Sequence, residues 1–129
     1  MVKLVKKETN SEPDFLPHVL RIADIAQNFK AKNIHAFDVS EFTTMTDCIF
    51  MCSASSAPQL KAIFSGIKDG MKEVGLRPFH SEGQVGGSWW LLDYDNIFVH
   101  VFKDEAYDFY DLEDFWADAK EVNLELDEA

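Results

Sequence analysis

The strongest constraint on the fold is one segment in which an apolar run leads into a helix start. Residues 48–52 read CIFMC and are apolar at every position, which is typical of a strand that is covered on both faces. Ser56 can then accept a hydrogen bond from the amide of Gln59, whose side chain can reach back, and Pro58 fits the first helical turn. A strand covered on both faces needs neighbours on both sides. This segment therefore predicts an α/β domain built in layers.

Three stretches carry apolar residues at three- and four-residue spacing and are predicted to be amphipathic helices. The first begins near Asp14, which can cap it, and the second follows Pro58 and ends at Gly75. Gly66 and Gly70 lie inside the second helix, where we expect them to allow close packing on a sheet. The third is a closing helix with acidic residues on its outer face, and its apolar face comprises Phe109, Leu112, Phe115, Trp116 and Ala119.

Five short segments are predicted to be strands: residues 34–39, 48–52, 77–80, 89–94 and 97–102. Asp95 and Asn96 separate the last two, and both tolerate the left-handed conformation of a hairpin turn. The predicted order is α-β-β-α-β-β-β-α. We therefore expect an α/β (α+β) fold with a mixed five-stranded sheet flanked by helices. The predicted organisation is a flexible segment at 1–13, one domain at 14–120 and an acidic tail at 121–129.

Charge is distributed unevenly along the chain. Of the 129 residues, 23 are acidic and 12 basic, for a net charge of -11. Residues 1–102 hold a net -2, whereas residues 103–129 hold 11 acidic and two basic residues, for a net -9. Such a protein should be repelled by phosphate backbones, so we expect no direct nucleic-acid binding by the surface as a whole. The acidic segment is either a solvated helix face with a frayed end or an attractor for a basic protein partner.

The sequence predicts no cofactor and no metal site. Cys48 and Cys52 lie about 13 Å apart along a strand, too far for a disulfide, so reduced thiols are expected. The four histidines do not combine with them into zinc-ligand spacing. No apolar run reaches the length of a membrane span, and the first residues lack both a signal core and an Arg-rich pattern. The predicted location is the cytoplasm, with no membrane contact.

One alternative is an enzyme. Asp93 and Asp95 form a D-x-D pair of the kind that holds Mg²⁺ in metal-dependent nucleotidyltransferases, and the serine-rich turn at 53–56 precedes a helix N-terminus. However, Asp is common in hairpin turns for conformational reasons. The serine-rich turn has no glycine and no adjacent lysine to meet a phosphate. His100 is interpreted as a core or supporting residue rather than as part of a Ser/His/Asp triad.

Trp89 and Trp90 point to an interaction surface. Adjacent side chains of a strand face opposite sides, so one tryptophan can lie in the core while the other is exposed. Exposed Trp and Tyr are enriched at protein-binding hot spots. Tyr94, Tyr110 and Trp116 could extend such a patch. The alternative is that both tryptophans are buried beneath helices.

Several separate motifs, in the same order, resemble the Iojap/RsfS family of ribosomal silencing factors. Residues 46–56 read TDCIFMCSASS, where the family has TDxFVIxTGTS, and residues 59–63 read QLKAI, where it has Q-x-K-A-I. The match continues with KNIHAFDV at 32–39, EG at 82–83, Trp89, LLDY at 91–94, VHVF at 99–102, and YDLE at 110–113 followed by Trp116. It covers residues 16–119. The chain departs from the family pattern at Ala54, Ala57-Pro58, Asp95-Asn96 and Tyr107.

The resemblance implies a fold similar to nucleotidyltransferases without their catalytic site, and hence no enzymatic activity. It implies binding to universal ribosomal protein fourteen of the large subunit, which blocks the small subunit and represses translation under nutrient limitation. A role in large-subunit maturation is also implied. A homodimer is left open. Matching positions place six residues at the partner surface: Trp89, Asp93, Tyr94 and Tyr110, together with Glu82 and Lys61.

Overall fold

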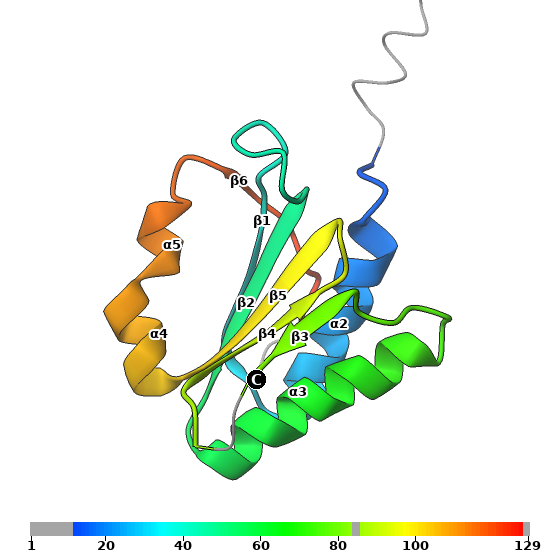
Figure 1. Cartoon of the computed structure of the whole chain (residues 1–129). Coiled ribbons are helices and arrows are strands. Elements are labelled where there is room, and N and C mark those ends of the chain that lie inside the picture. The colour runs from blue at the N-terminus through cyan, green and yellow to red at the C-terminus, as the bar shows by residue number, and fades with distance from the viewer. Residues whose placement is uncertain (1–11, 84–85, 128–129) are drawn as a thin grey trace, which may run out of the picture.

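A six-stranded mixed sheet forms the middle layer of the protein (Figure 1). The computed structural model describes residues 12–83 and 86–127. The strands lie in the order β3-β4-β5-β2-β1-β6, and only the central β2–β5 pair is parallel. Their bounds are Lys32–Asp38 for β1, Cys48–Ala54 for β2, His80–Glu82 for β3, Trp89–Asp93 for β4, Ile97–Lys103 for β5 and Lys120–Glu121 for β6. The predicted mixed α+β class is confirmed.

Helices cover both faces of this sheet (Figure 1). Helices α2, Leu16–Asn28, and α3, Ala57–Lys72, pack on one face, whereas α4, Asp104–Tyr110, and α5, Leu112–Phe115, lie over part of the other. Every residue of β2 is buried, as its uninterrupted apolar run predicted. Cys48 and Cys52 are both buried and free, and burial raises the pKa of each thiol.

The predicted count of five strands is wrong by one, because the sixth, β6, lies within the acidic end of the chain. It pairs antiparallel with β1 opposite Phe37 and Asp38. Beyond it, the amide of Val122 donates to the carbonyl of Ala36 at 2.8 Å, and Leu124 is buried in the main core. The alternating apolar residues of this segment thus attach it to the domain, although the sequence predicted a separate tail from residue 121. Residues 1–11 of the predicted flexible segment lie outside the described residues.

The strand predicted at residues 77–80 forms instead at His80–Glu82. Proline has no N–H to donate to a strand ladder, so Pro78 delays the start of regular pairing. The amide of Phe79 makes the first contact, donating to the carbonyl of Asp93 at 2.8 Å. The correction places β3 at one edge of the sheet with all three of its residues exposed.

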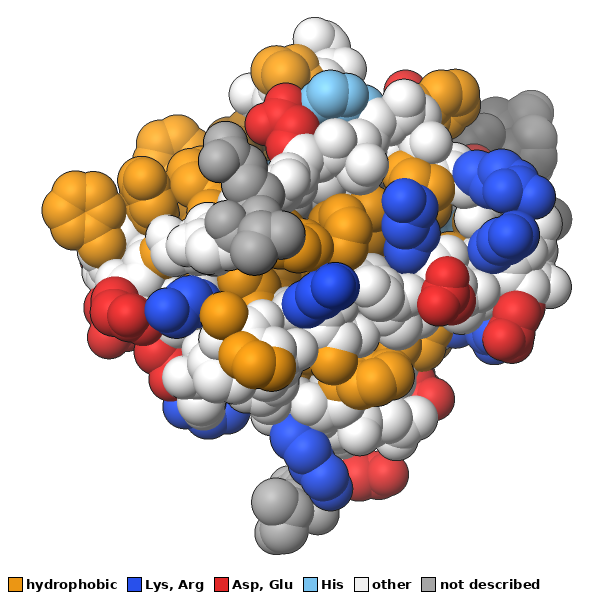
Figure 2. All heavy atoms as spheres, turned by 60° about the horizontal axis from the view of Figure 1, so that its bottom comes forward, with side chains coloured by type: hydrophobic (Ala, Val, Ile, Leu, Met, Phe, Trp, Pro, Cys, Tyr) orange, Lys and Arg blue, Asp and Glu red, His pale blue; other side chains and the backbone are white. Residues whose placement is uncertain are grey.

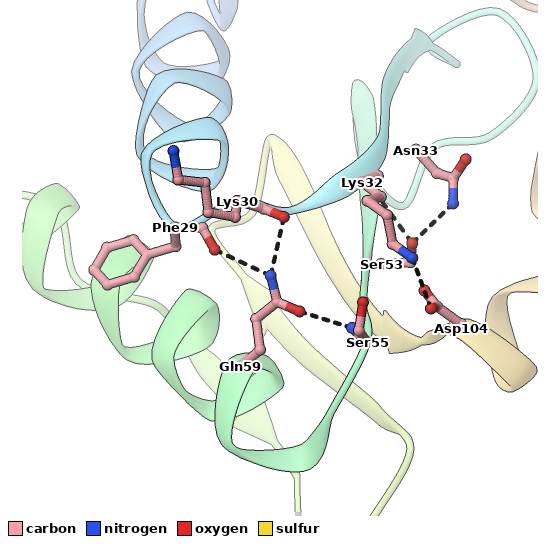
Figure 3. Close-up of polar contacts among 8 residues, drawn as sticks. All are labelled: Phe29, Lys30, Lys32, Asn33, Ser53, Ser55, Gln59 and Asp104. Atoms are coloured by element: carbon pink, nitrogen blue, oxygen red, sulfur yellow. Dashed lines mark hydrogen bonds and ion pairs between the residues drawn. The ribbon is translucent and has the colours of Figure 1, made fainter. Parts of the chain in front are cut away.

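Gln59 joins the start of α3 to the end of α2 (Figure 3). Ser56 caps α3 as predicted, with its hydroxyl accepting from the amide of Gln59 at 3.2 Å. The Gln59 side-chain oxygen accepts from the amide of Ser55 at 2.7 Å, rather than from that of Ser56. Its amide nitrogen donates to the carbonyls of Phe29 and Lys30 at 3.2 and 2.9 Å. One side chain therefore satisfies backbone groups at two helix ends.

Helix α2 begins differently from the prediction. Its N-cap is Phe15, which makes no side-chain capping bond and is buried, whereas Asp14 is exposed. Burial of the Phe15 ring and Pro17 in the first turn fix the helix start instead.

The two glycines of α3 were predicted to pack on the sheet. In the structure they face α2 instead. A Cβ at Gly66 would lie 2.3 Å from the ring of Phe29, and one at Gly70 would lie 2.4 Å from Cδ1 of Ile25. The missing side chains thus make room for the neighbouring helix. The result is a tightly packed helical layer in which α2 lies against β1 and α3 lies against β2, β4 and β5.

The predicted closing helix is broken at Asp111, which has left-handed backbone angles of φ 49° and ψ 50°. Aspartate tolerates this conformation better than most residues, and here it separates α4 from α5. The break rotates the apolar stripe. Leu112 and Trp116 still pack against the sheet, but Phe109 and Phe115 are exposed.

Candidate protein-binding site

Part of one sheet face is left open beside α4. The core beneath α4 and α5 is formed by β1, β2 and β5. All three residues of β3 are exposed, and β4 meets α4 where Trp89 contacts Tyr110. Trp90 and Leu92 of β4 point into the opposite core, with Trp90 edge-on to Phe64 at a centroid separation of 4.8 Å. Strand alternation therefore directs Trp89 and Asp93 to the open face. The prediction that only one of the two tryptophans would be in the core is confirmed.

Trp89 is held in place by residues from β5 and α4. Its ring centroid lies 5.1 Å from that of Phe102 and 4.6 Å from that of Tyr110. Its indole Nε1 donates to Nδ1 of His100 at 2.9 Å. The ring of Phe109 packs edge-on against Tyr110 at 5.1 Å. We call these five residues, Trp89, His100, Phe102, Phe109 and Tyr110, the aromatic cluster.

The outer rings of the aromatic cluster are open to solvent. Trp89 is 38% exposed, Tyr110 46% and Phe109 79%. A large ring that is already fixed by its neighbours loses little side-chain entropy when a partner covers it. For this reason packed but exposed Trp and Tyr are typical of binding hot spots.

His100 holds the ring of Trp89 in place by accepting a hydrogen bond from its indole N–H while the imidazole is neutral. An indole N–H can only donate, so Nδ1 of His100 must be unprotonated and the imidazole proton lies on Nε2. Burial lowers the pKa of His100 to about 4, which keeps the ring neutral at pH 7. His100 therefore has the supporting role that the sequence indicated, and it orients the exposed tryptophan.

Acidic residues lie on the elements next to the aromatic cluster, and one of them, Glu105, pairs with Lys103 at 3.8 Å. Glu105, Asp108 and Asp111 of the α4 segment are exposed beside it. On β3, Glu82 lies opposite Leu91 of β4 and therefore projects from the same face as Trp89. The site is consequently aromatic at its centre, with acidic residues on the neighbouring helix α4 and strand β3.

Two of the six predicted site residues are not part of this surface. Tyr94 is only 6% exposed, because it continues the alternation of Leu92 into the core, and burial raises its pKa to about 12. Lys61 is exposed on α3, where it lines a hollow with Pro58 and Trp90 on the other side of the sheet. The other four lie on or beside the open face: Tyr110 of α4 contacts Trp89, Glu82 lies opposite Leu91, and Asp93 is at the far end of β4 from Trp89.

The sequence did not identify Phe109 as a surface residue, because its spacing placed it on the buried side of one continuous helix. Asp111 alone could have indicated the break, and an aspartate without an adjacent glycine is a weak signal. The contact between Trp89 and Tyr110 joins residues 21 positions apart and depends on the tertiary fold.

The D-x-D pair has a structural role in the hairpin. Oδ1 of Asp93 accepts from the amide of Asp95 at 2.7 Å, and Asp95 has a φ of 74°. This is the local bonding that makes aspartate common in turns. Within residues 12–83 and 86–127, no group of three or more His, Cys, Asp or Glu side chains could hold a metal ion.

The fold is that of a small α/β protein with an open aromatic face. The family model described as "Ribosomal silencing factor during starvation" matches residues 12–129. The chain belongs to this family. The family name denotes a regulatory factor of the ribosome rather than an enzyme.

Curated relatives extend from bacteria to plastids. Ribosomal silencing factor RsfS of Bacillus subtilis is 33% identical over 109 residues, covering 84% of this chain and 92% of the relative. Protein Iojap, chloroplastic, of Arabidopsis thaliana is 30% identical over 127 residues, covering 98% of this chain and 53% of the relative.

Solved structures share the architecture. A crystal structure from Chromobacterium violaceum has a TM-score of 0.77 at 25% identity, covering 91% of this chain and 97% of that one. Another from Bacillus halodurans has a TM-score of 0.71 at 26% identity, covering 83% and 98%. None of the helices in the described ranges is long and apolar enough to cross a membrane.

Proposed function

We propose that this protein binds the large ribosomal subunit through the aromatic cluster and thereby prevents the small subunit from joining. The contact on the subunit is universal ribosomal protein fourteen. The observation that carries the proposal is Trp89, an exposed ring held by His100 and by Tyr110 of the acidic helix α4. Repression of translation under nutrient limitation, in the cytoplasm, follows from this occupancy, and a role in large-subunit maturation would use the same contact.

The charge around the site favours a basic protein as the partner. Glu105, Asp108 and Asp111 would repel an RNA backbone, whereas they would accelerate association with a basic ribosomal protein. Once docked, the aromatic rings supply most of the affinity and the carboxylates mainly set the rate and the orientation.

The mechanism requires no bond to form or break. A folded domain of 14.7 kDa seated on the intersubunit surface excludes the small subunit by its volume. The protein is therefore proposed to act stoichiometrically, without a cofactor. Subunit joining should fall in proportion to the fraction of large subunits that carry it.

The test is cosedimentation with isolated large subunits, followed by subunit joining measured by light scattering. We expect the wild type to pellet with large subunits and to slow joining, and Trp89→Ala to do neither while its circular dichroism remains native. Phe42→Ala is the matched control, since Phe42 is an exposed ring on the loop before β2, at the end of the sheet away from Trp89. A wild type that leaves joining unchanged would overturn the proposal.

The enzyme alternative has its own test. Asp93→Asn keeps an oxygen that can accept from the amide of Asp95, so the hairpin should survive. If the protein bound a nucleotide with Mg²⁺, and this variant abolished that binding, Asp93 and Asp95 would regain a catalytic role. Analytical ultracentrifugation of the same samples tests the homodimer.

A further inference from the structure

A second charged surface lies at the end of α3, and it is positive. Lys68 and Lys72 of the helix and Arg77 and Phe79 of the following segment line a surface hollow of about 330 Å³. His80, Pro78 and Ser81 complete it, and Asp69 is its one acidic residue. We call this hollow, with Lys68, Lys72, Arg77 and Phe79 as its defining side chains, the basic groove.

The three cations of the basic groove have no ion-pair partner among residues 12–83 and 86–127. Ion pairs occupy Arg21, Lys32 and Lys103, but Lys68, Lys72 and Arg77 have none among the described residues. Their side chains are exposed. They are therefore available to an external anion.

Spacing along α3 gathers the positive charge on one face. Lys61, Lys68 and Lys72 follow one another at seven- and four-residue steps, which places them on one side of a helix. Figure 2 shows this face, where Lys and Arg side chains lie beside exposed hydrophobic ones. Residues 57–81 hold four basic and two acidic residues, a net +2 in a chain of net -11. One of the two acids, Glu73, pairs with Arg21 at 3.2 Å.

An exposed ring accompanies these cations. Phe79 is 80% exposed, although its backbone is fixed by the 2.8 Å hydrogen bond from its amide to the carbonyl of Asp93. Cations that meet phosphates, next to an aromatic face on which a base can stack, are the elements of single-stranded nucleic-acid binding. An acidic peptide would use the cations but would have no need of the ring.

We propose that the basic groove binds a segment of unpaired RNA, with the phosphates on Lys68, Lys72 and Arg77 and a base stacked on Phe79. The net charge of the chain argued against nucleic-acid binding by the surface as a whole, but it averages over this region. The groove shares none of the defining residues of the aromatic cluster, so the proposal does not depend on the proposed function.

The test uses the full chain and a fluorescein-labelled twelve-nucleotide oligouridine, followed by anisotropy between 20 and 200 mM salt. Three phosphate contacts predict that log K falls with log[salt] at a slope of about -2. Lys68→Gln with Arg77→Gln should weaken binding at least about fivefold at low salt and flatten the slope by about 1.4. Phe79→Ala should weaken it by a factor of about 5 to 100 and leave the slope unchanged.

The matched control is Lys30→Gln with Lys120→Gln, which removes two exposed cations outside the groove. Because it changes only the net charge of the protein, it should change the RNA affinity by less than about twofold. Trp89→Ala should bind oligouridine like the wild type, so failure of the proposed function would remain distinguishable. Absence of binding at 20 mM salt, or equal losses in the groove and control variants, would overturn the proposal. A third result would also overturn it: polyglutamate competes for the groove at the same concentration as RNA, and Phe79→Ala has no effect on binding.

Discussion

The aromatic cluster and the basic groove both combine exposed rings with charged side chains, but they differ in sign and in how the ring is held. Trp89 is packed against Tyr110 of the acidic helix α4 and hydrogen-bonded to His100. Phe79 stands 80% exposed among lysine and arginine side chains. A fixed ring with a negative border fits a shaped protein surface, whereas an open ring with cations fits a flexible anionic strand.

The net charge of this protein does not describe the local charge on each of its faces. A value of -11 describes the end of the chain and conceals a positive face on α3. Electrostatic steering acts over about a Debye length, about 8 Å at physiological salt, so each face presents its own field. Partners are therefore better inferred face by face.

Replacing the tryptophan behind the aromatic cluster has the largest expected effect, and that effect is on folding. Trp90→Ala removes a half-buried ring packed on Phe64 and beside Gly83, so we expect the free energy of unfolding to fall by about 3 kcal/mol. Trp89→Ala should cost about 1 kcal/mol, because that ring is already partly exposed. Urea unfolding compares them, and equal losses would contradict the division between a core ring and a surface ring.

Acid is expected to weaken the aromatic cluster next most strongly. The unfolded chain protonates His100 near pH 6.5, whereas burial lowers the pKa of the folded residue to about 4. The unfolded state therefore binds the extra proton first, and stability is lost as the pH falls from 6.5 to 4, by at most about 3 kcal/mol.

The control for the pH dependence of stability is His100→Asn. Asparagine keeps a hydrogen-bond acceptor for Trp89 but cannot take up a proton in this pH range. Its stability should depend less on pH over this range than that of the wild type. Parallel pH profiles for the two proteins would assign the acid sensitivity to another group.

Charge reversal should separate the rate of docking from its strength. Glu105→Lys with Asp108→Lys turns part of the border of the aromatic cluster positive, so we expect the association rate with large subunits to fall about tenfold. The dissociation rate should change little, since these side chains lie at the rim. The control is Asp24→Lys with Glu41→Lys, which reverses two exposed acidic residues elsewhere on the protein. Association is measured by stopped flow. An equal loss of association rate in the control would show that Glu105 and Asp108 are not part of the binding site.

The smallest expected effect is a gain in the basic groove. Glu73→Gln frees Arg21 from its ion pair and removes a negative charge near Lys72, so oligouridine affinity should rise about two- to threefold at low salt. Because the pair is exposed, the free energy of unfolding should change by less than about 1 kcal/mol. Unchanged affinity at 20 mM salt would indicate that the RNA does not approach this end of α3.

Much of the fold could be predicted because its signals are local. The apolar run of β2 and the Ser56 cap with Pro58 each depend on a few adjacent residues. The same holds for the alternation that separates Trp89 from Trp90. These signals identify the central strand, the longest helix and the exposed tryptophan.

The remaining features depend on contacts that no local pattern encodes. The pairing of β6 with β1 joins segments about 80 residues apart, and the left-handed Asp111 interrupts an otherwise continuous apolar stripe. Tyr94 is buried because the phase of β4 continues into the turn. The basic groove likewise appears only when the segment after α3 folds back beside Lys68 and Lys72.

Crossing two variants with two ligands decides whether the two faces bind separate ligands, as we propose. Trp89→Ala and Phe79→Ala are each titrated against isolated universal ribosomal protein fourteen and against the labelled oligouridine. We predict that Trp89→Ala loses the protein by a factor of about 30 or more and keeps the RNA, and that Phe79→Ala does the reverse. Loss of both ligands by either variant, or retention of both by either one, would contradict the account.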